Sequence, residues 1–103
     1  SLAIKLVNFF AKKVKKLYLY DPVSIPNASK ALEKHQNIVF CKDPYEHVPH
    51  SNALIICTEW DLFKNPDVNK LKLLKDKTIF DGRNILDQDM VIKAGIDYFG
   101  IGT

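Results

Sequence analysis

The chain has 103 residues, a length typical of one domain, and 47% of them are hydrophobic, enough to form a core. Its net charge of +3 is small, and its lysines are spread over several segments, which argues against a nucleic acid partner. No apolar run reaches the roughly 20 residues that a membrane span needs. These properties predict a soluble, cytoplasmic, single-domain protein and say nothing about its chemistry.

The cysteines and histidines do not predict a metal site. Cys41 and Cys57 each end an apolar run, and neither belongs to a CxxC or Cys/His spacing. They are predicted to be free, buried thiols in a reducing cytoplasm. His35, His47 and His50 have no partner spacing that suggests a metal or a catalytic triad, and they are predicted to lie on the surface.

Helices and strands are predicted to alternate along the chain. An apolar stripe at three- and four-residue spacing predicts a first helix over residues 2–14. The strands predicted after it lie at 16–21, 37–41, 52–58, 77–82 and 96–102, and the further helices at 28–36, at 61–76 in two pieces around Pro66, and at 88–95. Between the second and third strands, a short helical turn is predicted to stop at Pro49. The continuous apolar character of 52–58 predicts burial on both faces. This alternation, without hairpin signals, predicts a parallel α/β sheet with helices on both faces.

Compact polar clusters follow the predicted strands. They are Asp21, Lys42, Thr58 with Glu59, and Asp81-Gly82-Arg83. Ligands bind open parallel sheets at the carboxyl ends of the strands, so these clusters are expected to form a polar rim. Arg83 suits a phosphate because its planar guanidinium gives paired, charge-assisted hydrogen bonds. Gly82 allows the backbone to approach a ligand closely.

Plainer roles are open for the same residues. Arg83 could equally pair with Asp81 or Asp87 at the surface. Trp60 suits a packing anchor better than a stacking platform, and Glu59 could merely begin the following helix, where negative charge is favourable. The chain carries no glycine-rich phosphate motif and no nucleophile elbow. The residues alone therefore predict a parallel α/β domain with a rim that could hold an anion.

Several motifs together resemble the C-terminal, UDP-binding domain of the UDP-glucose/GDP-mannose dehydrogenase family. They are Thr-Glu-Trp at 58–60, Phe-Asp-Gly-Arg at 80–83, Tyr-Asp-Pro at 20–22 and the closing strand at 94–102. The resemblance implies that residues 1–103 form a Rossmann-like three-layer sandwich with a mainly parallel sheet of about five strands. It also implies that the family's first, central strand is missing, so the chain is expected to be an N-terminally truncated piece.

The resemblance further implies the activity of the whole enzyme, a two-step oxidation of UDP-glucose to UDP-glucuronate by two NAD. The catalytic cysteine and most NAD contacts belong to segments that precede this one, so no catalytic residue is expected here. The chain alone is expected to be inactive. The rest of its own polypeptide and further copies, in a dimer or larger homo-oligomer, are the expected partners, with no nucleic acid and no membrane.

By match to Phe-Asp-Gly-Arg, Arg83 is expected to contact the UDP-sugar. A supporting rim is expected from Asp81, Gly82, Thr58, Glu59 and Trp60. Trp60 favours the glucose branch, because relatives acting on UDP-N-acetylmannosamine tend to carry histidine there. Two alternatives stay open. One is another nucleotide-sugar dehydrogenase, acting on UDP-N-acetylmannosamine or GDP-mannose, and the other is a non-catalytic doubly wound module that binds a partner.

Overall fold

The structure is a computed structural model that describes residues 2–20, 30, 32–58 and 61–100. Of the helix predicted at 28–36, residues 28, 29 and 31 lie outside the described residues, and residues 32–36 form turns rather than a continuous helix. The chain divides into two compact units, Ser1–His47 and Val48–Thr103, and each is described by itself. Among the described residues, no helix is both long and apolar enough to cross a lipid bilayer.

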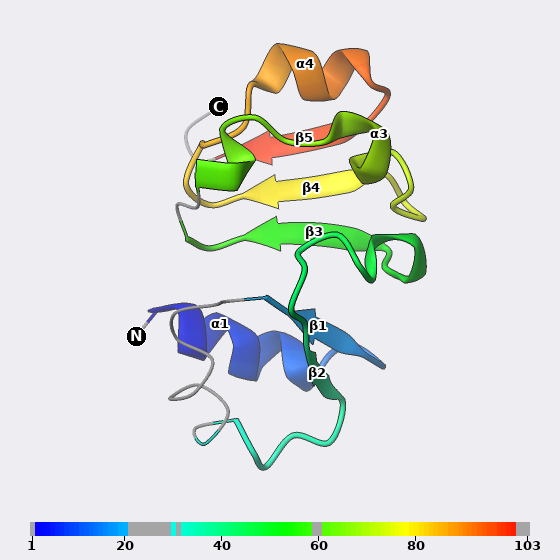
Figure 1. Ribbon diagram of the computed structural model, residues 1–103. Helices are drawn as coiled ribbons and strands as arrows, with labels where there is room; N and C mark the ends of the chain where they lie inside the picture. Colours follow the sequence, from blue (N-terminus) through cyan, green and yellow to red (C-terminus); the bar gives the residue numbers. More distant parts are fainter. Residues whose placement is uncertain (1, 21–29, 31, 59–60, 101–103) are drawn as a thin grey trace. The chain divides into compact units, whose positions relative to one another are not determined.

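The first unit contains one helix and two short strands. Helix α1 spans Leu2–Ala11, strand β1 spans Leu17–Leu19 and strand β2 spans Ile38–Phe40 (Figure 1). The two strands pair in parallel. The ladder continues one residue beyond β2, because the backbone N–H of Cys41 donates to the carbonyl oxygen of Leu19 at 2.8 Å. Both predicted strands are confirmed.

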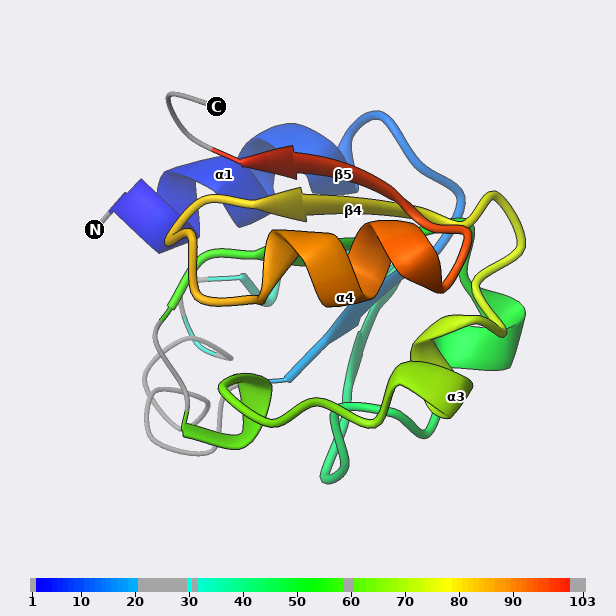
Figure 2. The ribbon, with the colours of Figure 1, turned by 90° about the horizontal axis from the view of Figure 1, so that it is seen from above.

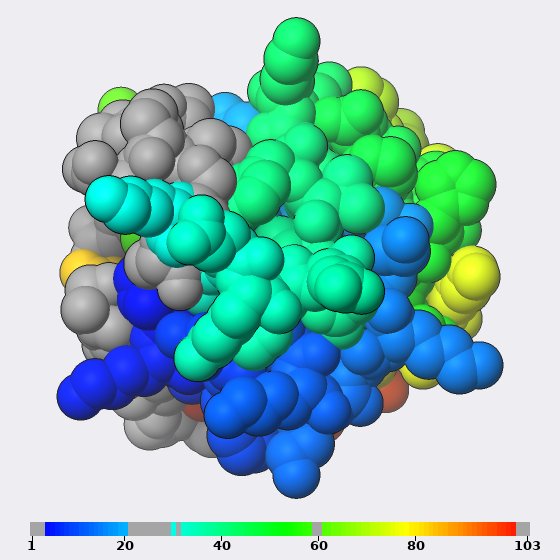
Figure 3. Space-filling view, turned by 90° about the horizontal axis from the view of Figure 1, so that it is seen from below, coloured from blue at the N-terminus to red at the C-terminus, as the bar shows by residue number. Residues whose placement is uncertain are grey.

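Helix α1 ends at Ala11, three residues earlier than the apolar stripe predicted. The Asn37 side-chain amide donates to the carbonyl oxygens of Ala11 at 2.7 Å and Val14 at 2.9 Å, so these groups are satisfied without a further helical turn. Nε2 of His35 lies 2.7 Å from Oδ1 of Asn8 on α1, and the His35 ring is half-buried rather than on the surface as predicted. In Figure 3 the cyan segment lies beside the blue one that contains α1.

The second unit contains a three-stranded parallel sheet in the order β3-β4-β5. Its strands span Ala53–Ile56, Thr78–Asp81 and Asp97–Gly100. Its helices are α3 at Val68–Leu71 and α4 at Gln88–Lys93, with 3-10 turns at Val48–His50 and Asp61–Phe63. Figure 2 shows α3 and α4 on one side of the sheet. The core of this unit includes Leu71, Ile79 and Val91, each 0% exposed.

Capping residues bound the helices of the second unit. The Asp67 carboxylate accepts the N–H of Lys70, and the Asp87 carboxylate accepts the N–H of Met90, both at 3.2 Å. Gly95 has a φ of 83°, a conformation that favours glycine and closes α4. The prediction of two helical pieces between the third and fourth strands is confirmed.

The parallel α/β class is confirmed, with three differences of detail. The five described strands form two sheets, one of β1 and β2 and one in the order β3-β4-β5, rather than the single sheet that was predicted. Strand β3 is outermost in its sheet, so its predicted burial on both faces is only partial: Ala53 is exposed and only Ile56 is fully buried. Pro49 lies inside a 3-10 turn rather than ending one, because its fixed φ suits that geometry.

Candidate functional site

The carboxyl ends of three parallel strands lie together at one edge of the second unit. Figure 1 shows the arrowheads of β3, β4 and β5 on the same side, and the register places Asp81 between Ile56 and Gly100. Thr58, which is half-buried, comes two residues after β3 ends, and residues 82–83 come directly after β4. The structure therefore brings together Thr58 and the Asp81-Gly82-Arg83 segment.

Other residues predicted for this rim are placed differently or not described. Lys42 follows β2 in the first unit and is exposed. Asp21, Glu59 and Trp60 lie outside the described residues. The described rim of the second unit consequently rests on Thr58 and the segment that begins at Asp81.

Asp81 is the buried polar residue of the described core, with 1% of its surface exposed. Its Oδ1 accepts the backbone N–H of Arg83 at 3.1 Å. Its Oδ2 accepts the backbone N–H of Leu86 at 2.9 Å and the hydroxyl of Tyr98 at 3.0 Å. A buried carboxylate needs such donors, because water cannot solvate it. Asp81 is thus a buried internal anchor of the rim rather than a surface residue.

The segment that follows Asp81 is held at several points. The backbone N–H of Gly82 donates to the carbonyl oxygen of Ile56 on β3 at 2.9 Å. A Cβ atom at Gly82 would lie 3.0 Å from that same oxygen, which explains why glycine occupies this position. Asn84 adopts a φ of 51°, in the left-handed region that asparagine tolerates better than most residues. Arg83, exposed between these two fixed residues, is presented at the rim on a defined loop.

Tyr98 on β5 keeps its proton in this environment. Burial, the hydrogen bond to Asp81 and the negative charge of Asp81 raise the pKa of Tyr98 to about 12, from 10.0. The phenol is therefore a hydrogen-bond donor to the Asp81 carboxylate at neutral pH. Its role in the geometry is to fix the carboxylate.

The two thiols lack the features of a catalytic nucleophile. Burial raises the pKa of Cys57, and burial together with the negative charge of Glu46 raises the pKa of Cys41. Both cysteines are unpaired, Cys41 buried and Cys57 half-buried. A nucleophilic cysteine needs a lowered pKa, because the thiolate is the reactive form. Both thiols are free as predicted, and the predicted burial is confirmed for Cys41 but only partial for Cys57.

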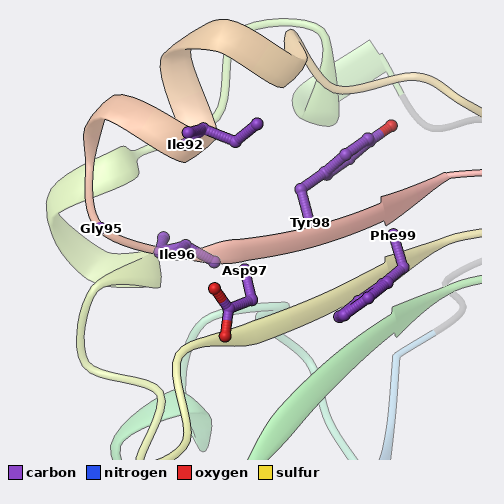
Figure 4. A pocket seen from close by; sticks show the side chains of 6 residues that line it. All are labelled: Ile92, Gly95, Ile96, Asp97, Tyr98 and Phe99. Atoms are coloured by element: carbon purple, nitrogen blue, oxygen red, sulfur yellow. The ribbon is translucent and has the colours of Figure 1, made fainter. Parts of the chain in front are cut away.

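A shallow hollow on the outer side of β5 is a poor site for a phosphorylated ligand. Figure 4 shows its six labelled residues, with Tyr98 directed to the α4 side of the strand and Phe99 to the opposite side. Asp97 is the sole charged residue among these six, and the others are glycine, isoleucine or aromatic. A negative charge there repels a diphosphate, so the rim beside Arg83 is the better candidate.

One group of potential metal ligands was not predicted from the sequence. Cys41, Glu46 and His47 in the first unit each place a potential ligand atom within 4.8 Å of the other two. His47 is half-buried rather than a surface residue, with its ring stacked on Tyr18. Glu46 and His47 lie five and six residues after Cys41, and this spacing matches no familiar metal-binding motif. The one available signal in the sequence was the Asp43-Pro pair, which marks a tight turn after Cys41.

The second unit has a parallel α/β sheet with a polar rim at its carboxyl edge, which is the architecture of nucleotide-binding domains. Residues 1–88 match the UDP-binding domain of the UDP-glucose/GDP-mannose dehydrogenase family. The chain belongs to this family.

Individual relatives agree with the family match. The chain is 35% identical over 99 residues to the UDP-glucose 6-dehydrogenase of Gallus gallus, an alignment that covers 84% of this chain and 20% of that protein. It is equally similar to the UDP-glucose 6-dehydrogenase of Bos taurus, with the same coverage. To the UDP-glucose 6-dehydrogenase of Rickettsia prowazekii it is 32% identical over 104 residues, which cover 100% of this chain and 24% of the relative. The chain thus spans about a fifth to a quarter of the length of these curated relatives.

Proposed function

We propose that this chain binds the UDP part of UDP-glucose, as the UDP-binding domain of a UDP-glucose 6-dehydrogenase. The family match and the relatives, which carry that name, support the proposal. In the whole enzyme, NAD serves as the oxidant and UDP-glucose is converted to UDP-glucuronate. NAD is bound mainly by segments other than these residues, and the enzyme acts in the cytoplasm as a homo-oligomer.

Arg83 is the residue proposed to contact the nucleotide diphosphate. The observation that carries this assignment is the pair of hydrogen bonds that the N–H groups of Arg83 and Leu86 donate to the buried Asp81 carboxylate. Those bonds fix the loop backbone before any ligand arrives, so less conformational freedom is lost on binding. A guanidinium on such a loop offers a diphosphate paired, charge-assisted hydrogen bonds.

The neighbouring rim residues have supporting roles in this proposal. Gly82 leaves room for a ligand beside the loop, since it has no side chain. Thr58 offers a hydroxyl from the adjacent strand end, and Glu59 and Trp60, the next residues of the Thr-Glu-Trp motif, are proposed as further rim residues. These residues shape the pocket around the contact that Arg83 makes.

Calorimetric titration of UDP tests the assignment. UDP is titrated into the 103-residue chain and into a polypeptide of the relatives' length that contains it, each with and without Arg83→Ala. Loss of a charge-assisted hydrogen bond costs about 1.5–3 kcal/mol, which corresponds to roughly 10- to 150-fold weaker binding. Arg83→Lys keeps the charge without the planar fork, so its affinity is expected to fall between those of the other two proteins.

Lys75→Ala is the matched control. Lys75 is also exposed and cationic, but its backbone N–H bonds to the carbonyl oxygen of Ser51 ahead of β3, at the amino ends of the strands. Its removal is expected to leave UDP affinity unchanged. Absence of UDP binding in both polypeptides, or equal affinity with and without Arg83, would refute the assignment. Tighter binding of GDP than UDP would instead favour the GDP-mannose branch of the family.

A further inference from the structure

The turn after β2 gathers three side chains of different chemistry in the first unit. Cys41 follows β2 directly, and its backbone is held by the N–H bond to Leu19 on β1. Its side chain is buried, with 6% exposure, and its thiol donates a long hydrogen bond of 3.7 Å to the carbonyl oxygen of Val39. The sulfur is therefore fixed at the base of the turn without a strong hydrogen bond to its own strand.

Glu46 is folded back over the turn toward Cys41. Its Oε1 accepts the backbone N–H of Lys42 at 3.0 Å and that of Asp43 at 3.3 Å. These two bonds hold the carboxylate by one oxygen only. Its other oxygen, Oε2, lies 3.6 Å from Nε2 of His47.

The His47 ring, which lies in the turn after β2, is held by an aromatic side chain on strand β1. It stacks on Tyr18 of β1, with ring centroids 4.2 Å apart and planes 11° from parallel. This contact orients the imidazole plane and leaves Nε2 beside the Glu46 carboxylate. The side chains of His47 and Glu46 are 29% and 42% exposed, so a solvated ion has access to the group.

The distances fit a small divalent cation after a modest adjustment. One ligand atom from each of Cys41, Glu46 and His47 lies within 4.8 Å of the other two. Zinc bonds of about 2.0–2.3 Å place tetrahedral ligand atoms about 3.5 Å apart, so closure needs movements of about 1 Å. A thiolate, an imidazole and a carboxylate together suit zinc better than calcium or magnesium, which prefer oxygen ligands alone.

We propose that Cys41, Glu46 and His47 form a binding site for a zinc-class divalent cation, with the fourth position open to water. Binding breaks the S–H bond of Cys41, forms a metal–sulfur bond and releases the proton to solvent. The bound cation ties the end of β2 to the turn that follows it. The site shares no residue with the proposed UDP rim, so either proposal can fail without the other.

Cobalt(II) titration provides the test, because cobalt occupies zinc sites and its bond to a thiolate gives a near-ultraviolet charge-transfer band. The band is expected in the unmodified chain and in Cys57→Ser, and its loss is expected in Cys41→Ser. His47→Gln and Glu46→Gln are expected to weaken cobalt binding at least about tenfold, the effect typical of lost metal-site partners. Added zinc should abolish the band, and Arg83→Ala should leave it unchanged. A band that survives in Cys41→Ser, or no band in the unmodified chain, would overturn the proposal.

A second measurement uses only the unmodified chain, so its result does not depend on whether a variant folds correctly. The unmodified chain is alkylated with and without zinc, and the modification of each cysteine is measured by mass spectrometry. Zinc is expected to slow alkylation of Cys41 at least about tenfold and to leave Cys57, the internal control, unaffected. Equal rates at Cys41 with and without zinc would count against the site as firmly as a missing cobalt band.

Discussion

Replacing Asp81 by asparagine is expected to destabilise the second unit with little change in side-chain volume. The carboxylate has 1% exposure and accepts hydrogen bonds from three donors. An asparagine in its place has one oxygen and one amide group, and the amide is itself a donor. If its oxygen serves Leu86 and Tyr98, its amide faces the N–H of Arg83, and two donors oppose each other.

The magnitude follows from those three bonds. Losing the bond to Arg83 removes about 1.5–3 kcal/mol, and the two remaining bonds each weaken by about 1 kcal/mol when the acceptor becomes neutral. Removing a buried charge offsets part of this loss, because the carboxylate no longer has to be desolvated. We expect a net decrease of about 2–4 kcal/mol in the free energy of unfolding, out of the 5–15 kcal/mol typical of small domains.

Urea unfolding followed by tryptophan fluorescence measures this change. Trp60 is the sole tryptophan of the chain and belongs to the second unit, so its signal reports on the unit that contains Asp81. Asp87→Asn is the matched control: Asp87 caps α4 through one bond to Met90, and asparagine caps helices about as well as aspartate. Its stability is expected to lie within about 0.5 kcal/mol of the unmodified chain.

A specific result would refute the role of Asp81 as a buried anchor. If Asp81→Asn unfolds at the same urea concentration as Asp87→Asn, the three donors do not depend on a charged acceptor. The UDP titration adds a second readout, since a loosened Arg83 loop should also weaken binding. Unchanged stability together with unchanged UDP affinity would show that Asp81 does not organise the rim.

Two further predictions concern other parts of the described structure. The proton of Tyr98 is held more tightly in the folded chain, because its pKa is raised to about 12 from 10.0. The stabilisation that the protonated Tyr98 contributes is complete below pH 10.0 and is lost as the pH rises through about 12. The difference in unfolding free energy between the unmodified chain and Tyr98→Phe should therefore shrink over that pH range. A constant difference over the same range would contradict this prediction. Asn37→Ala removes the bonds to the carbonyl oxygens of Ala11 and Val14 and should cost about 1–3 kcal/mol, with a loss of helical circular dichroism. Unchanged helicity would show that α1 ends independently of Asn37.

The sequence by itself determined the local elements of this protein and the order in which they occur. Apolar runs separated by helical stretches predicted five parallel strands, and the predicted strands are confirmed where the structure describes them. The end of the last helix at Gly95 was predicted too, whereas the caps at Asp67 and Asp87 were not, although they carry the usual local signal of a helix start. Such signals act over three or four residues, so they can be read along the chain without knowledge of its fold.

Tertiary structure alone decided what the polar side chains do. Asp81 was predicted only as part of a polar rim, but packing buried its carboxylate and gave it donors up to 17 residues away. Helix α1 ended early because Asn37, 26 residues from Ala11, reached its last carbonyl groups. Cys41 and His47 came together because the turn between them folded back against β1. These outcomes depend on contacts between distant residues, and local spacing does not encode such contacts.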